Sequence, residues 1–204
     1  MGCDIHLYLE EKIDGKWKCL DKFTEDSKGF LEVEEWLHDD RDYDFFAVLA
    51  GVRNGCDFVP ISEPRGLPPD CSHELLRYHD EADYGFHSHS WLGYKEILKY
   101  YIDLSYKYVE KDGWVTKKDY DFFKLVGRPS SYFGGGGGES ISNEEMEKLD
   151  PSVDYKWKYK TLIQWKESYY ECVGQRLDRL LEEMVKYSTK KIESDIRIVF
   201  WFDN

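Results

Sequence analysis

The two ends of the chain alternate between apolar and polar residues, and this pattern constrains the fold most. Residues 3–10 place apolar side chains at every second position, and residues 195–203 do the same. Alternation with a period of two is typical of a strand that is buried on one face. We therefore predict that both termini form strong strands and that these strands lie side by side in one sheet.

Helices are expected between these strands. The pattern predicts a short buried helix over residues 45–52 with Asp44 as its N-cap, and another over residues 91–101 with Ser90 as its N-cap. Apolar residues at steps of three and four predict a long helix over residues 159–187. The expected fold class is α+β: an antiparallel or mixed sheet that contains both terminal strands, with helices packed mainly on one face.

The chain of 204 residues is expected to form a single domain over residues 1–204, either simple or with an insertion. Four prolines make residues 56–86 a long connection, in which Ser72 begins a short helix. Residues 127–140 contain five consecutive glycines and predict a flexible loop or lid. Turns are expected at Asp14-Gly15, inside a hairpin, and at Asp112-Gly113. Ser142 and Glu145 form a capping-box pattern, which predicts a short helix that ends before Pro151.

Composition limits the partners of this protein. A net charge of −13 argues against nonspecific binding to nucleic acid, which needs a basic surface. No apolar run approaches the length of a membrane span, and charges begin at Asp4, so neither a membrane partner nor a signal peptide is expected. The five cysteines contain no CxxC pair and suggest reduced thiols. We expect a soluble intracellular protein.

Four residues form the candidate catalytic and metal-binding set: Asp4, His6, His87 and His89. A D-x-H pair on a strand together with an H-x-H pair supplies ligands that suit a divalent transition metal such as zinc or manganese. Without a metal, the same histidines could act as general base and general acid. The alternative is that these histidines are hydrogen-bonded structural residues in a polar layer.

A second set of residues is expected to bind the ligand. Arg53 and Arg65 would hold phosphate groups, with Asn54 beside Arg53 and Asp70 as a further neighbour. The aromatic side chains of Tyr8 and Trp91 would stack on a base. For Arg53 the alternative is that it satisfies carbonyl groups at the end of the preceding helix.

Several motifs together resemble a family of uncharacterised proteins from bacteriophage and prophage genomes. The motifs are MGCDIH at residues 1–6, RDYDFFAVLAGVRN at 41–54, PRGLP at 64–68 and HSHSWL at 87–92, and the closing segment 197–204 is similar too. The resemblance covers about half of the chain. It implies a location in the cytoplasm of a bacterial host and an accessory role, such as countering host defence that uses nucleotide signals.

Three functions are compatible with these patterns. The first is a hydrolase that acts on a phosphate-bearing, nucleotide-like small molecule through the aspartate and histidines. The second is a binding protein that sequesters such a ligand without changing it. The third is an acidic protein-interaction or inhibitor module.

Overall fold

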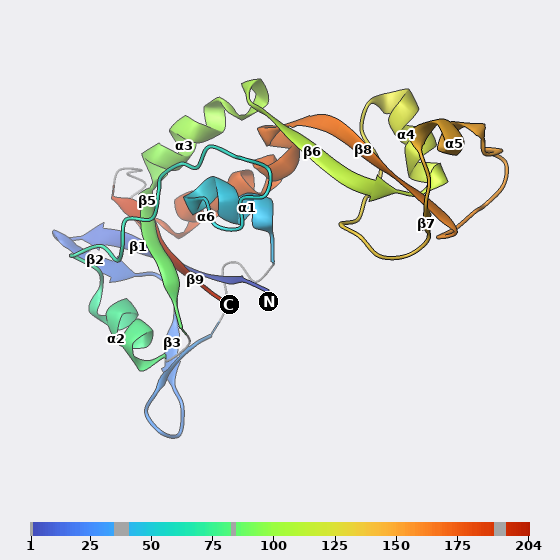
Figure 1. The fold of residues 1–204 in the computed structure, drawn as a ribbon. Helices are drawn as coiled ribbons and strands as arrows, with labels where there is room; N and C mark the ends of the chain where they lie inside the picture. Colours follow the sequence, from blue (N-terminus) through green and yellow to red (C-terminus); the bar gives the residue numbers. More distant parts are fainter. Residues whose placement is uncertain (1, 35–40, 83–84, 190–194) are drawn as a thin grey trace. The chain divides into compact units, whose positions relative to one another are not determined.

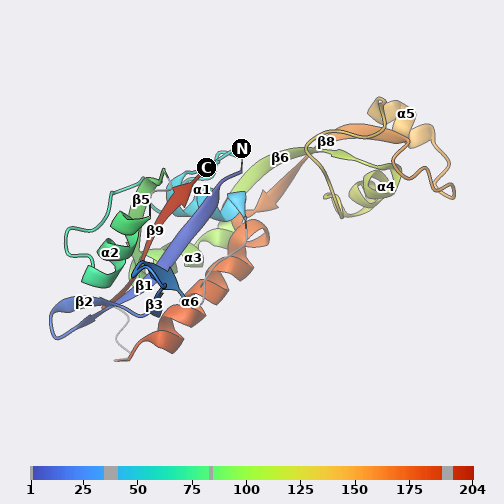
Figure 2. The ribbon, with the colours of Figure 1, turned by 90° about the horizontal axis from the view of Figure 1, so that it is seen from below.

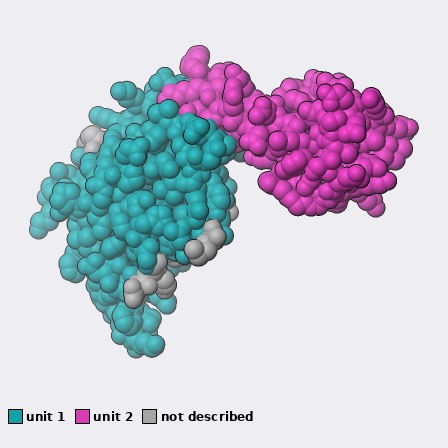
Figure 3. Space-filling view, viewed as in Figure 1, with its two compact units in different colours: residues 1–105, 170–204 teal, residues 106–169 magenta. Residues whose placement is uncertain are grey.

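The computed structural model describes residues 2–34, 41–82, 85–189 and 195–204. The chain divides into two compact units (Figure 3). Unit 1 consists of residues 1–105 and 170–204, and unit 2 consists of residues 106–169. Unit 2 is therefore inserted, in sequence, between two parts of unit 1.

Unit 1 is built on a four-stranded antiparallel sheet of order β2-β1-β9-β5. Its strands are β1 (Asp4–Ile13), β2 (Lys16–Cys19), β9 (Ile196–Asp203) and β5 (His87–Gly93). The terminal strands β1 and β9 pair along eight positions, from Asp4 opposite Asp203 to Glu11 opposite Ile196. The predicted α+β class and the predicted pairing of the two ends are both confirmed. The turn at Asp14-Gly15 joins β1 to β2, as expected.

The two faces of this sheet are covered differently (Figure 1 and Figure 2). One face carries α1 (Tyr43–Ala50), α3 (Tyr94–Ile102) and α6 (Gln175–Tyr187), and the Phe46 ring of α1 packs 5.2 Å from the Phe202 ring. The opposite face carries α2 (His73–Glu81) and the hairpin of β3 (Phe23–Glu25) and β4 (Leu31–Val33). There, Tyr8, Tyr78 and Trp201 form the centre of a core cluster. We call these the α1 face and the α2 face.

Helix α1 begins two residues earlier than the sequence indicates. Its N-cap is Asp42, whose carboxylate accepts a hydrogen bond from the Phe45 amide at 3.1 Å, so Asp44 lies inside the first turn. Gly51 ends the helix in the left-handed conformation, with φ of 70°. This stop fixes the position of Arg53 beyond the helix end.

The predicted helix over residues 91–101 is shorter than expected. Ser90 is not its N-cap, because Ser90 and Trp91 belong to strand β5 and pair with Phe200 and Val199 of β9. Helix α3 starts only at Tyr94. The strand continues because its edge pairs with the central strand β9, and this pairing overrides the local signal for a cap.

The prediction of one helix over residues 159–187 is wrong in its first half. Residues Tyr159–Ser168 form strand β8, which is followed by a π-helical turn over Tyr170–Gly174 and only then by α6. Along β8, Thr161, Ile163 and Trp165 are buried at every second position. The apolar spacing in this stretch fits both periods, and pairing with β6 (Tyr108–Val115) selects the strand.

Unit 2 has its own small core. Strands β6 and β8 are antiparallel, and the short β7 (Glu139–Ser140) pairs with the start of β8 in parallel. Strand β6 runs straight through Asp112-Gly113, so the turn predicted there does not exist. Helices α4 (Lys117–Val126) and α5 (Asn143–Lys148) cover the sheet, and α5 begins with the predicted capping box of Ser142 and Glu145. The core residues are Val115, Tyr120, Met146, Ile163 and Trp165.

Both stretches that were predicted as connections contain regular structure. The connection 56–86 contains α2, which begins after Ser72 as expected, and the segment 127–140 ends in β7. The remaining short element is a 3₁₀ turn over Leu104–Tyr106. Within the described residues, no helix has the length and apolar character needed to cross a membrane.

Candidate functional site

An irregularity in β5 decides where the predicted histidines lie. His87 stands opposite Phe202 and Ser90 stands opposite Phe200, so β5 has one residue more than β9 between these two pairs. Ser88 takes up the extra residue with a φ of 53°, a left-handed value that is uncommon outside glycine. Across this β-bulge the side-chain alternation shifts by one position. His87 and His89, which would share a face in a regular strand, therefore lie on opposite faces.

His87 lies on the α1 face and lines an open cleft of about 640 Å³. Its ring stacks 6.1 Å from that of Phe202. Three segments that are far apart in the sequence meet at this cleft: the end of α1, the start of the proline-rich connection and strand β5. The lining residues are Ala50, Gly51, Val52, Arg53, Glu63, Pro64, His87, Ser88 and Asn204.

Arg53 provides the cationic side of the cleft. It follows the glycine stop of α1 with a φ of 55°, so three residues of the lining are left-handed: Gly51, Arg53 and Ser88. Its Nη2 donates to the Asn204 side chain at 2.8 Å and approaches the Gly2 carbonyl oxygen at 3.5 Å. These bonds position the guanidinium in the lining of the cleft, and its planar set of N–H groups matches the geometry of phosphate oxygens.

His87 provides the titratable group of the cleft. Its Nδ1 forms a 2.9 Å hydrogen bond with the Ser88 hydroxyl, and the tautomer decides which of the two donates. Its Nε2 is shielded from solvent and has no hydrogen-bond partner among the residues that the structure describes. A buried imidazole nitrogen without a partner is costly. A rotation of the ring that brings Nε2 to the cleft would let a ligand oxygen supply the missing bond.

Cys3 lies next to this cleft and interacts with Arg53. Burial raises the pKa of the Cys3 thiol, and the hydrogen bond and charge of Arg53 offset part of that increase. The thiol is fully buried, so it acts as a packing residue beside the cleft and not as an activated nucleophile.

The other two predicted histidine positions lie on the α2 face. His6 bonds through Nε2 to the Asp203 carboxylate at 3.1 Å, and its ring lies 6.1 Å from that of Trp201. His89 lies at the same distance from Trp201 and forms a 2.9 Å Nε2–Nε2 hydrogen bond with His79 of α2. Burial lowers the pKa of His89, and the neighbouring histidines lower it further. His6 and His89 therefore lie near the same ring, that of Trp201, but each bonds to a different partner.

Asp4 is engaged in an exposed ion pair. Arg41 donates to both of its carboxylate oxygens, at 2.8 and 2.6 Å. These hydrogen bonds lower the pKa of Asp4. Among the described residues, no group of three His, Cys, Asp or Glu side chains is arranged to hold a metal ion. Asp4, His6, His87 and His89 do not form one ligand set in this structure, and the zinc or manganese ion stays a prediction.

The residues expected to bind the ligand are dispersed. Asn54 closes a loop, because its side chain both donates to and accepts from the backbone of Phe58 at 2.8 Å. Arg65 forms a two-point ion pair with Glu96 and lies 4.9 Å from the Trp91 ring. Trp91 is thus stacked by protein, and Tyr8 has no exposed surface. Only Arg53 from this set lines the cleft with His87.

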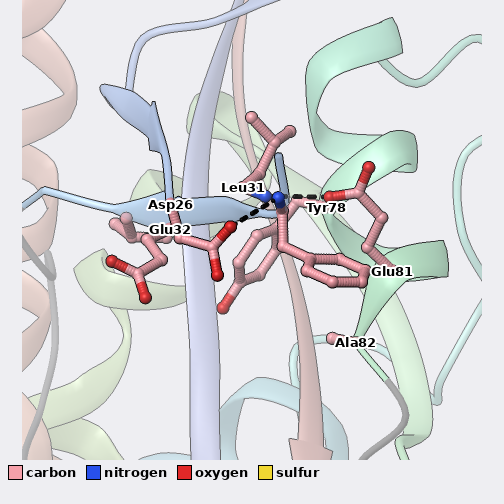
Figure 4. A pocket seen from close by; sticks show the side chains of 8 residues that line it. Asp26, Leu31, Glu32, Tyr78, Glu81 and Ala82 are labelled. Carbon is pink, nitrogen blue, oxygen red and sulfur yellow. Dashed lines mark hydrogen bonds between the residues drawn. The ribbon is translucent and has the colours of Figure 1, made fainter. Parts of the chain in front are cut away.

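A second pocket lies on the α2 face, between the β3–β4 hairpin and α2 (Figure 4). It has a volume of about 530 Å³, and the acidic side chains of Asp26, Glu32 and Glu81 line it. Glu81 accepts a hydrogen bond from the Leu31 amide at 2.8 Å, and Asp26 accepts one from Phe30 at 2.9 Å. Glu81 thus ties the hairpin to α2, Asp26 closes the turn of the hairpin, and the negative charge of the lining does not suit an anionic ligand.

Sequence reasoning missed four residues that the fold places at these sites. Ser88, Glu63 and Asn204 line the cleft, and His79 pairs with His89. His79 could have been considered from the sequence, because it lies close to the short helix predicted after Ser72. The other three depend on the bulge and on the approach of distant segments.

Comparison of the chain with protein-family models, with curated proteins and with solved structures finds no match.

Proposed function

We propose that unit 1 is a hydrolase for a phosphate-bearing, nucleotide-like small molecule and that the cleft of Arg53 and His87 is its active site. The observation that carries the proposal is that these two residues, 34 positions apart in sequence, line one cleft, where the buried Nε2 of His87 has no partner among the described residues. Arginine donors match phosphate oxygens. An imidazole is the side chain best suited to exchange protons near neutral pH.

The proposed roles follow from these chemistries. Arg53 would hold a phosphate oxygen through its guanidinium, which Asn204 positions at 2.8 Å. His87 would transfer a proton through Nε2, while the Ser88 hydroxyl at Nδ1 fixes the orientation of the ring. Water would be the nucleophile. The nucleotide-like part of the ligand and the role against host defence are proposed from the resemblance to bacteriophage proteins.

Two variants test the site. Purified protein is incubated with inorganic phosphate and with a panel of cyclic and linear nucleotides, binding is followed by thermal shift, and the ligand is recovered after denaturation. Arg53→Gln should weaken binding by about tenfold or more, because hydrogen bonds to charged groups contribute roughly 1.5–3 kcal/mol. His87→Ala should abolish turnover and leave binding measurable.

Matched controls separate the cleft from the rest of the surface. His73→Ala changes an exposed histidine at the start of α2, and Arg179→Gln changes an exposed arginine of α6, so neither should alter binding or turnover. Intact ligand recovered from wild type would favour sequestration over hydrolysis. Equal activity of wild type, Arg53→Gln and His87→Ala would remove the proposal.

One observation favours an acidic interaction module as the second candidate. Residues 106–169 contain eleven Lys and Arg and eleven Asp and Glu, so the whole net charge of −13 falls on unit 1. A partner held by this charge should dissociate as the salt concentration rises. A partner complex that withstands 0.5 M salt, on the order of several physiological ionic strengths, would argue against this candidate.

A further inference from the structure

Unit 2 carries a short segment in which lysines and aromatic residues alternate. We call residues 155–160 the lysine–aromatic stripe; its sequence is Tyr-Lys-Trp-Lys-Tyr-Lys. Trp157 at its centre is 63% exposed, which is unusual for the largest apolar side chain. Lys156 and Lys158 on either side are exposed as well. A flat aromatic surface flanked by cations is thus presented to solvent.

The glycine run holds this stripe in place. A side chain at Gly138 would meet the Trp157 carbonyl oxygen, so only glycine permits the approach of the two backbones. The Glu139 amide donates to the Lys158 carbonyl oxygen at 2.8 Å, and Lys160 Nζ donates to the Gly136 carbonyl oxygen at 2.6 Å. The loop therefore serves as a backbone support for the stripe.

Aromatic contacts orient the rings of the stripe. The Phe133 ring meets the Trp157 ring edge to face at 5.2 Å, and Phe133 is tied to Trp114 by two backbone hydrogen bonds of 3.0 Å. Lys160 Nζ lies 4.8 Å from the Trp114 ring. A pre-oriented ring loses little conformational freedom when a ligand stacks on it.

A cleft of about 840 Å³ borders the stripe. Tyr155, Lys156 and Trp157 line it together with Lys117 and Lys118 of α4. The acids in its lining are engaged: Asp121 pairs with Lys117 at 2.6 Å, Asp119 accepts from Thr116 and Ser130, and Asp154 accepts from the Lys156 amide. Exposed lysines and aromatic rings remain as the groups available to a ligand.

The negative net charge of the whole chain does not apply to unit 2. Its eleven basic and eleven acidic residues balance, so the charge that argues against nucleic-acid binding belongs to unit 1. We propose that the lysine–aromatic stripe of unit 2 binds single-stranded nucleic acid. Trp157 would stack on an unpaired base, and Lys156 and Lys158 would contact the neighbouring phosphates. A duplex offers no free base face to the indole.

This proposal is independent of the active site proposed in unit 1. Its test uses the full chain and a fluorescein-labelled oligothymidylate of about 15 nucleotides, a length within the usual site sizes for single strands. Fluorescence anisotropy gives the Kd between about 50 and 200 mM salt. Trp157→Ala should raise the Kd about tenfold, since stacking of one base has an effect of this order.

The role of Lys156 and Lys158 is tested by the salt dependence of oligonucleotide binding. Each phosphate contact to a single strand contributes about 0.7 to the slope of log K against log salt. The double variant Lys156→Gln, Lys158→Gln should therefore flatten this slope by about 1.4. Lys166→Gln is the matched control, because Lys166 is an exposed lysine further along the same chain segment, in β8, and pairs with Glu110 at 3.3 Å.

Three results would overturn the proposal. The first is that wild type does not bind the oligonucleotide at 50 mM salt, about the lowest ionic strength of the series. The second is that Trp157→Ala and the double variant bind as tightly as Lys166→Gln. The third is tighter binding of a duplex of the same length. Circular dichroism of each variant checks that unit 2 is folded.

Discussion

His87 and His89 project from opposite faces of β5, although only Ser88 separates them. His87 stacks on Phe202 on the α1 face, and His89 bonds to His79 on the α2 face. The bulge at Ser88 thus assigns one histidine to the open cleft and the other to a packed cluster. The two imidazoles should respond differently to the same substitution.

His87→Phe should raise the free energy of unfolding by about 1 kcal/mol, because it removes a buried nitrogen that has no partner among the described residues. The same change at position 89 should lower it, because His79 would lose the bond to Nε2. Urea unfolding of the two variants measures both effects. Destabilisation of similar size in both would mean that His87 is an ordinary packing residue.

The ion pair of Glu10 and Arg197 should be the most sensitive polar contact of unit 1. These cross-strand neighbours are almost fully buried, and Arg197 Nε donates to Glu10 Oε2 at 2.8 Å. Arg197→Met leaves the buried Glu10 carboxylate without its cation and should cost about 3–5 kcal/mol. Glu10→Leu should cost less, because Arg197 keeps its ion pair with Asp70 at 2.8 Å. The double variant should lose much less stability than the sum of the losses in the two single variants.

A double-mutant cycle from urea unfolding gives the coupling of this pair. Arg41→Gln is the control, because the Arg41–Asp4 pair is half exposed and solvent-exposed ion pairs contribute little to stability. Additive losses in the cycle would show that the two buried groups do not depend on each other.

Asp21 should make the protein less stable as the pH rises from 4 to 6. Burial raises the pKa of Asp21 from 3.8 to about 6, although its carboxylate accepts the Leu9 amide at 2.7 Å. Between these values the unfolded chain has released the proton and the folded chain keeps it. The free energy of unfolding therefore falls with rising pH, by about 3 kcal/mol in total.

Asp21→Asn keeps an oxygen for the Leu9 amide and removes the titration. Relative to this variant, wild type should lose stability across the same pH range, as measured by denaturant unfolding at fixed salt. Parallel pH profiles of the two proteins would contradict a raised pKa at this position.

The titration of His89 should make the protein less stable as the pH falls, which is opposite to the effect of Asp21 and occurs at slightly higher pH. Burial lowers its pKa below the ordinary value of 6.5. Just below pH 6.5 the unfolded chain binds a proton at this position that the folded chain does not bind, so stability falls as the pH falls. His89→Gln should flatten this decline, and exposed His73→Gln should not.

Gly138→Ala should loosen the support of the lysine–aromatic stripe. The new methyl group would meet the Trp157 carbonyl oxygen, and φ at this position is 70°. Amide exchange at Glu139 and Ile141, which donate to Lys158 and Lys160, should become faster. Gly134→Ala is the matched control, because nothing lies within 4 Å of a Cβ placed there. Equal exchange in both variants would contradict a supporting role for the loop.

Much of the framework could be predicted from the sequence. The alternation in residues 3–10 and 195–203 predicted both terminal strands, because a period of two persists only where one face of a strand is buried. The Asp14-Gly15 turn and the capping box at Ser142 were also predicted, since each depends on bonds within a few residues. Interactions between residues close in sequence were sufficient to predict these elements.

The strand at residues 159–168 and the faces of the histidines were decided by tertiary structure. In the first case pairing with β6 chose between two periods that the sequence allows. In the second, one extra residue in β5 reversed the alternation, and no local pattern specifies a bulge whose position depends on register with β9. The sequence by itself determined which side chains could do chemistry. Tertiary structure determined which of them meet, because that depends on contacts between segments far apart in the chain.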